Sequence, residues 1–575
     1  MRRTFVLFCA FTLTATFGYS APLQASRFAF DSKSLLLDGK RDFLISGEFH
    51  YFRVPKAEWK RRLELFKAAG GNCIATYIPW IIHEEKEGEI VFGDRPERDL
   101  DGFLKLVEEE GLMAIVRPGP YQYSELVNNG LPKWLIEEHP EIILRNADGS
   151  KFCESAVDYC HPTFLAKVRP YFRAVAKVLR PHLDINGGCV VLTQLDNELT
   201  GVHVWLGYKP NEAYYAKCAD YLETLRNYLK EDGIPGPYCH NAGGGEMCAN
   251  YKLAMDRLGT KDFILGYDHY YGLFQGEMET PCPYYFFKSL FACDMLRGYG
   301  LPPVGFEIQA GTFGDVPPIL KEDLFTSYMV NLAAGLRGIN YYVFTGGPNY
   351  PGTGAEGEIY DYQAPIAADG TIRPTYDALK QFGAFLKAHP ELLEAQRLTS
   401  VRMGLEWTHS AKLRPYDENF NRFGVFYALM QTDYSPEYYL LGGEIPLDGK
   451  PLILAGLGEL SEEARARVEA YKAKGGKVLV TPGDEVLKTT WKQQHFRDAE
   501  RVAARVAALG AQPVVRSSNR NVFTTAYRLK DGRTGVFALN LRTGIQKTTI
   551  SIPSGASAEF NLPPMTVDYR ILPIK

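Results

Sequence analysis

The chain has 575 residues, of which 46% are hydrophobic and 23% charged, and its formal net charge is −4 at pH 7. This composition is typical of a globular protein of several domains and excludes a disordered chain. The near balance of 64 basic and 68 acidic residues also argues against a nucleic-acid binder and a polybasic membrane-surface protein.

The first 20 residues have the pattern of a signal peptide. Arg2 and Arg3 precede an apolar run from Phe5 to Phe17, and small residues follow before Ala21. The run is too short for a membrane span, and no later segment has the roughly 18 consecutive apolar residues that a span needs. We therefore expect an exported protein, periplasmic or extracellular, with no membrane span in the mature chain.

Residues 28–390 alternate between short apolar runs and segments with helical periodicity, which is typical of parallel βα units. Eight such units predict a (β/α)8 TIM barrel, with an open doubly wound sheet as the alternative. The predicted strands are Asp42–Tyr51, Asn72–Trp80, Leu112–Pro118, Cys189–Gln194, Pro237–His240, Phe263–His269, Pro303–Ile308 and Gly338–Phe344. The main helices between them are expected at Ala57–Ala69, Leu100–Glu110, Phe164–Leu179, Ala213–Leu229, Tyr284–Arg297 and Leu324–Leu336.

Two smaller units are predicted after the barrel. Residues 400–510 contain a strand–helix–strand pattern with Ser461 as the helix N-cap, which indicates a small doubly wound α/β domain of the flavodoxin or amidotransferase kind. Residues 511–575 alternate apolar and polar residues between turns, which predicts a small C-terminal β-sandwich. The complete fold class is therefore α/β, a barrel followed by these two domains.

Nine cysteines remain once Cys9 of the signal peptide is removed, and none forms a CxxC pair. An oxidising compartment permits disulfides, and Cys153/Cys160 and Cys239/Cys248 are close enough in sequence to be candidates.

The histidines lack the spacing of metal ligands, so we predict no metal site. The GxGxxG motif at Gly352–Gly357 opens no helix, so we predict no cofactor.

Catalytic groups of a TIM barrel lie at the carboxyl ends of its strands. Glu198 follows the fourth predicted strand directly after Asn197, and Glu307 ends the seventh. Two carboxylates facing each other at one barrel mouth are what glycoside hydrolysis requires, one protonated as acid and one ionised as nucleophile. Retention of configuration requires about 5–5.5 Å between the carboxyl groups, and inversion about 6.5–9.5 Å.

Long stretches of the barrel sequence resemble a known family. They include Ser46–Glu84, Leu112–Leu135, QLDNE at Gln194–Glu198, GFEIQAG at Gly305–Gly311, NYYVFTGG at Asn340–Gly347 and YDYQAPI at Tyr360–Ile366. On these motifs the chain resembles glycoside hydrolase family 35, the β-galactosidase family. The resemblance does not extend to the C-terminal region, whose layout is similar instead to family 42 β-galactosidases and to hybrid exo-glucosaminidases.

The resemblance implies roles for seven residues. Glu198 falls on the family's acid/base and Glu307 on its nucleophile. Asn197 matches the asparagine that contacts the sugar 2-hydroxyl. The remaining matches are sugar contacts, at Tyr77, Glu125, Tyr342 and Tyr362. Tyr342 is also expected to position the nucleophile.

Several positions near these residues differ from the usual sequence of the family. Leu126 replaces a tryptophan, Asp196 replaces a glutamate, and Pro348 replaces a threonine. These changes leave the catalytic pair untouched and bear on the choice of sugar. Among the other polar residues at strand ends, Glu48, Arg53 and Arg117 have structural roles as their simplest interpretation. Asp268–Tyr271 fit pocket-lining roles and packing or orienting roles equally well.

The leading hypothesis is an exported retaining exo-β-glycosidase, a β-galactosidase acting on terminal sugars of oligo- or polysaccharides. The first alternative is the same chemistry on glucosamine, arabinopyranose or fucose. The others are a non-catalytic carbohydrate-binding barrel and a metal-dependent hydrolase. By analogy with the family 42 layout, the α/β domain is also a candidate surface for a homo-oligomer.

Overall fold

The computed structural model describes residues 26–574, except 147, 154–155, 200, 202, 204–206, 271–282, 313–317, 407–418, 456, 458–459 and 482–493. Among the described residues, no helix is both long enough and apolar enough to cross a membrane. The predicted signal peptide lies outside the described range.

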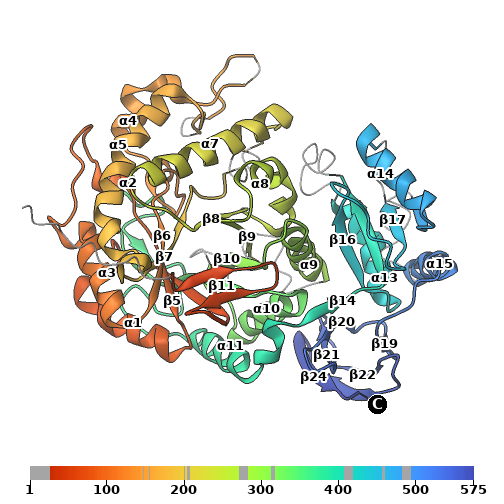
Figure 1. The fold of residues 1–575 in the computed structure, drawn as a ribbon. Helices are drawn as coiled ribbons and strands as arrows, with labels where there is room; N and C mark the ends of the chain where they lie inside the picture. The colour runs from red at the N-terminus through yellow and green to blue at the C-terminus, as the bar shows by residue number, and fades with distance from the viewer. Residues whose placement is uncertain are drawn as a thin grey trace, which may run out of the picture.

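Eight parallel strands form a closed barrel in the order β10-β11-β4-β5-β6-β7-β8-β9 (Figure 1). The barrel strands are β4 Leu44–Phe49, β5 Cys73–Tyr77, β6 Met113–Arg117, β7 Val190–Gln194, β8 Tyr238–Asn241, β9 Phe263–His269, β10 Val304–Gln309 and β11 Gly338–Thr345. Every residue in these strands is buried, as expected where a parallel sheet is covered on both faces. The predicted closed barrel is therefore confirmed.

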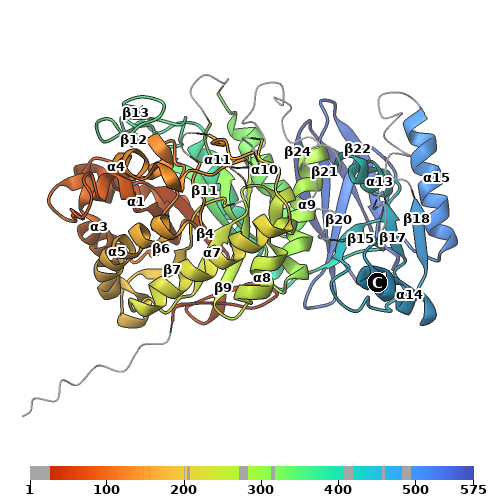
Figure 2. The ribbon, with the colours of Figure 1, turned by 90° about the horizontal axis from the view of Figure 1, so that it is seen from above.

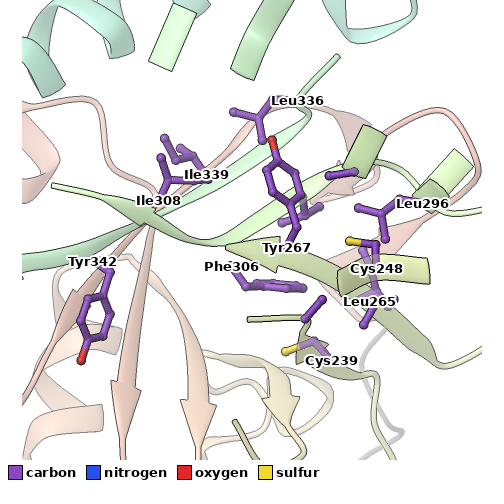
Figure 3. Close-up of a cluster of buried hydrophobic side chains, with 14 of the residues drawn as sticks. Cys239, Cys248, Leu265, Tyr267, Leu296, Phe306, Ile308, Leu336, Ile339 and Tyr342 are labelled. Atoms are coloured by element: carbon purple, nitrogen blue, oxygen red, sulfur yellow. The ribbon is translucent and has the colours of Figure 1, made fainter. Parts of the chain in front are cut away.

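The six helices predicted in the barrel region begin and end close to their expected positions, as α1 Trp59–Ala68, α3 Leu100–Glu109, α5 Pro162–Leu179, α7 Glu212–Glu231, α9 Pro283–Gly298 and α10 Lys321–Ala334. The helices α2 Trp80–His83, α4 Lys133–Glu138, α8 Lys252–Leu258 and α11 Tyr376–Ala388 were not predicted. Figure 3 shows how one part of the layer between strands and helices is filled. Tyr267 of β9, Leu296 of α9 and Cys248 group together there, while the ring of Tyr342 lies apart from them.

A small antiparallel sheet of β1 Phe28–Phe30, β2 Leu35–Leu37 and β3 Lys40–Arg41 precedes the barrel. A side chain at Gly338 would meet Leu35, Leu44 and Val304, so Leu35 lies against the amino ends of three barrel strands. This sheet therefore covers the barrel end opposite to the carboxyl ends of the strands. After the barrel, β12 Gly347–Pro348 and β13 Ile359–Tyr360 form a two-stranded sheet in the loop that follows β11.

The middle domain has four parallel strands in the order β16-β15-β17-β18. Its elements are β15 Val401–Leu405, α13 Asn419–Gln431, β16 Pro436–Leu440, β17 Leu452–Ala455, α14 Glu462–Ala473, β18 Val478–Thr481 and α15 Gln494–Ala508. The Ser461 side chain accepts a hydrogen bond from the Ala464 N–H, which confirms Ser461 as the N-cap of α14.

The C-terminal domain consists of two antiparallel sheets. One has the order β14-β20-β21-β24 and the other β19-β22-β23. The strands are β14 Gln396–Leu398, β19 Arg516–Ser517, β20 Phe523–Arg528, β21 Thr534–Asn540, β22 Gln546–Ser551, β23 Ser557–Leu562 and β24 Thr566–Leu572. Strand β14 precedes the middle domain in sequence, so the C-terminal sandwich includes a segment from before residue 400.

The alternation of side chains along β20 and β21 divides them between two cores. Phe523, Tyr527 and Phe537 belong to the large core shared with the barrel, while Ala526 and Val536 belong to a separate core inside the sandwich. Figure 2 shows these strands beside α9 and α10 of the barrel. The C-terminal sheet is thus buried on both faces, and one of those faces packs on the barrel.

All eight cysteines of the described residues are free thiols, so the candidate disulfides Cys153/Cys160 and Cys239/Cys248 are wrong. Two of the sulfur atoms face other elements. Cys160 Sγ donates to the Lys217 carbonyl at 3.2 Å, and Cys239 Sγ lies 4.0 Å from Gln194 Oε1. Proximity in sequence therefore did not bring these thiols together. Cys282 lies outside the described residues.

Candidate active site

The seven residues singled out from the sequence gather at the carboxyl end of the barrel. Tyr77 ends β5, Glu307 lies in β10 and Tyr342 in β11, while the other four lie in loops that follow strands. All seven side chains are buried, namely Tyr77, Glu125, Asn197, Glu198, Glu307, Tyr342 and Tyr362. The fold therefore brings them into one site, as the barrel topology predicts.

The Glu307 carboxylate is held by donors from four different strands or strand ends. The Tyr270 hydroxyl donates to its Oε2 at 2.8 Å. Its Oε1 lies 3.1 Å from the Tyr77 hydroxyl and 3.3 Å from Asn241 Nδ2, and it also accepts from the Arg117 guanidinium. Donors of this kind stabilise the ionised carboxylate and fix its orientation.

Arg117 is the central cation of this site and is 1% exposed. It donates to Glu48 Oε2 at 2.8 Å, to Asn197 Oδ1 at 2.8 Å and to Glu307, and its guanidinium lies 4.0 Å from the centre of the Tyr77 ring. Burial disfavours its charge, but Glu48 and Glu307 raise the pKa of Arg117 well above its ordinary value. Arg117 therefore stays charged and ties Glu48 and Asn197 to Glu307.

Asn197 is fixed by contacts on both ends of its amide. Its Oδ1 accepts from Arg117 and lies 2.9 Å from the Tyr77 hydroxyl, and its Nδ2 donates to the Gln122 carbonyl at 3.1 Å. The preceding Asp196 accepts from the Asn197 N–H and from the Tyr221 hydroxyl. The loop after β7 is thus anchored immediately before Glu198.

Glu198 lies opposite Glu307 in a cluster of three carboxylates. One oxygen each from Glu198, Asp268 and Glu307 lies within 4.8 Å of the others. Burial is the largest cause that raises the pKa of Glu198 well above its ordinary value, followed by the negative charges of Asp268 and Glu307. The site thus places Glu198, whose environment favours the protonated form, close to Glu307, whose carboxylate accepts from four donors.

Glu125 is the centre of a second group of contacts. The hydroxyls of Tyr360 and Tyr342 donate to its Oε2 at 2.7 Å and 3.1 Å, and the Tyr362 ring stacks on Tyr360 with centroids 5.4 Å apart. Burial raises the pKa of Glu125 to about 7, against the opposing effects of the Tyr360 hydroxyl and the Arg53 charge. A buried carboxylate among aromatic rings can bind a sugar, because the sugar hydroxyls donate further hydrogen bonds to the carboxylate and the rings pack on the sugar face.

Several site residues have left-handed backbone conformations that are uncommon outside glycine. These include Glu125 at φ 48°, Glu198 at φ 45° and Tyr362 at φ 46°. Such conformations cost free energy and cluster at functional sites, where the surrounding structure enforces them. Here they belong to the loops after β6, β7 and β11, at the carboxyl end of the barrel.

Sequence reasoning missed some residues of the site and misplaced one contact. Tyr342 donates to Glu125, whereas the hydroxyls that contact Glu307 are those of Tyr77 and Tyr270. Asn241 and Tyr360 were also missed as parts of the site, while Asp268 fitted pocket-lining and packing roles equally well. The available signals were the strand-end positions of Asn241 and Asp268 and the place of Tyr360 at the start of the YDYQAPI motif.

Comparison with known proteins agrees with this geometry. The model of glycosyl hydrolases family 35 matches residues 34–386. An exo-beta-D-glucosaminidase of Pyrococcus horikoshii is 26% identical over 83% of this chain and 72% of that protein. The beta-galactosidase of Homo sapiens is 31% identical over 62% of this chain, which spans about half (48%) of that protein.

The overall fold has a solved counterpart. A crystal structure of beta-galactosidase from Bacillus circulans sp. alkalophilus superposes with a TM-score of 0.67, covering 93% of this chain and 99% of that chain. The sequence identity of this pair is only 12%, so the match concerns the fold alone. The family model, in contrast, covers the barrel that carries the candidate site. The chain therefore belongs to glycosyl hydrolases family 35 and is a glycosidase.

Proposed function

We propose that the protein is a retaining exo-β-glycosidase that removes terminal β-galactosyl residues from oligo- or polysaccharides. The observation that carries the proposed chemistry is the nearness of Glu198 and Glu307, one oxygen of each lying within 4.8 Å of the other. Two carboxyl groups this close support double displacement, in which the groups stand about 5–5.5 Å apart.

In the proposed first step, Glu307 attacks the anomeric carbon while Glu198 protonates the departing glycosidic oxygen. The contacts from Arg117, Tyr77, Tyr270 and Asn241 favour the ionised nucleophile, and the raised pKa of Glu198 favours the acid. In the second step, Glu198 takes a proton from water, whose oxygen displaces Glu307 from the anomeric carbon. We assign sugar hydroxyl contacts to Tyr77, Asn197, Glu125, Tyr342 and Tyr362.

A second candidate substrate is a terminal β-glucosaminide. The observation in its favour is the similarity to a protein named exo-beta-D-glucosaminidase, which extends over 83% of this chain and so beyond the barrel. Arabinopyranosides and fucosides share the same chemistry and belong in the same test.

The experiment is a panel of 4-nitrophenyl β-glycosides of these four sugars, run in excess chelator, with NMR detection of the first-formed anomer. We expect the galactoside to be the best substrate and the β-anomer to appear first. Glu198→Gln should lower kcat/KM by about 10²–10⁴-fold. Faster turnover of another sugar would replace the substrate, an α-anomer would refute retention, and sugar binding without turnover would favour a non-catalytic barrel.

We also propose that the chain is exported and forms a homo-oligomer through its α/β domain. Export is supported by the charged and apolar pattern of residues 1–20. N-terminal sequencing of the protein recovered from outside the cytoplasm should begin near Ala21. Sedimentation at micromolar concentration should give a mass above that of the 64.6 kDa chain.

A further inference from the structure

Asp268, near the end of β9, is a third carboxylate of the site that the proposed steps do not use. It is 1% exposed, and its Oδ2 accepts from Asn241 Nδ2 at 2.7 Å. Its Oδ1 is also buried, and no N–H group or hydroxyl of the described residues donates to it. A buried carboxylate oxygen left in this way is costly unless another donor reaches it.

The carboxyl group of Glu198 is near enough to supply such a donor, since one of its oxygens lies within 4.8 Å of one of Asp268. A hydrogen bond between the two acts to raise the pKa of Glu198 and to lower that of Asp268, as expected with Glu198 as the donor and Asp268 as the acceptor. Two buried carboxylates at this distance do not both stay ionised, so the pair retains one proton. Asn241 donates to Asp268, which favours Asp268 as the ionised member and Glu198 as the protonated one.

Only a few of the titratable groups that face the Glu198–Asp268 pair are charged near pH 7. The groups that face it are Arg117 of β6, Tyr121 and Tyr123 after β6, Cys248, Tyr270 after β9, and Glu307 of β10. Burial raises the pKa of the four phenol and thiol groups, that of Tyr123 to about 12, so they stay neutral near pH 7. Arg117 and Glu307 therefore carry the neighbouring charges.

We propose that Asp268 is a positioning residue that keeps the catalytic proton on Glu198 through a carboxyl–carboxylate hydrogen bond. This inference rests on the proposed role of Glu198 as acid/base. In the first step, the proton passes from Glu198 to the glycosidic oxygen as the bond to the anomeric carbon breaks. In the second, the charge of Asp268 makes the ionised Glu198 a stronger base toward water, whose proton restores the bond to Asp268.

The test is the pH dependence of kcat/KM in Asp268→Asn. An asparagine oxygen can still accept from Asn241, but the negative charge is lost and an N–H₂ group faces Glu198. The ionised form of Glu198 is then favoured, and the alkaline limb of the profile should move down by about one pH unit or more. Asp184→Asn is the matched control, because this aspartate is also buried but contacts the Ser26 hydroxyl and the Arg27 N–H before β1, and it should leave this limb in place.

A second readout separates protonation from structural damage. Near pH 7, Asp268→Asn should lower kcat/KM about tenfold or more for a β-galactoside with an alkyl leaving group, and far less for the 2,4-dinitrophenyl galactoside, which needs little protonation. If the asparagine variant folds poorly, Asp268→Ser should likewise lose more kcat/KM for the alkyl galactoside than for the 2,4-dinitrophenyl galactoside. An unmoved alkaline limb, or equal losses for both leaving groups, would overturn the inference. Failure of the wild type to turn over any glycoside would instead refute the proposed function.

Discussion

At the scale of single residues, Glu125 links the site to stability through its buried carboxyl group. Burial raises the pKa of Glu125 from its ordinary 4.5 to about 7 in the folded chain. The folded state then binds this proton more tightly than the unfolded state, so stability is lost as pH rises from about 4.5 to about 7. The raised pKa corresponds to about 3 kcal/mol of unfolding free energy.

Glu125→Gln removes this titration. Relative to wild type, the variant should gain about 3 kcal/mol of unfolding free energy between pH 4 and pH 8, as measured by urea denaturation. Tyr360→Phe should do the opposite and steepen the pH dependence, because it removes a donor to the ionised carboxylate. Parallel stability profiles for wild type and Glu125→Gln would contradict this account of Glu125.

The catalytic pair could be predicted from sequence at this scale, but its surroundings could not. Glu198 follows an apolar strand and Glu307 lies toward the end of another, and closure of the barrel brings such positions together. Asp268 and Tyr270 also stand at a strand end, yet the pattern there fits packing and orienting roles equally well. Their contacts with Glu198 and Glu307 depend on side-chain directions that only the closed barrel fixes.

At the scale of elements, the barrel strands were predictable because each is a short apolar run bounded by helical periodicity. The strand predicted at Phe263–His269 has the same ends in the structure, and that predicted at Gly338–Phe344 ends one residue later. Strand β14 was not predicted. It has only three residues, and its partner β20 lies far along the chain, so no local pattern marks it.

At the scale of the whole molecule, Asp294 of α9 joins all three parts of the chain. It forms a buried ion pair with Arg397 of β14, and its Oδ2 accepts from the Tyr438 N–H of β16 at 3.0 Å. The barrel, the C-terminal sheet and the middle domain therefore meet at one carboxylate.

Asp294→Ala would leave the Arg397 guanidinium buried without its carboxylate. We expect a loss of about 3–5 kcal/mol in unfolding free energy and faster proteolysis of the segment between α11 and β15. The paired change Asp294→Leu with Arg397→Met should recover most of that loss, because apolar groups of similar size often replace a buried ion pair. A double variant as unstable as Asp294→Ala would show that the pair does not hold these parts together.

In the proposed reaction, Glu307 forms a covalent bond to the terminal sugar while Glu198 acts beside it. This covalent intermediate can be trapped by incubation with 2-deoxy-2-fluoro-β-galactosyl fluoride and located by peptide mass mapping. A slowly hydrolysed intermediate should place one fluorosugar on the peptide that contains Glu307, and Glu307→Gln should take up none. A label on Glu198 or on any other residue, or turnover of the reagent without a covalent adduct, would contradict the account.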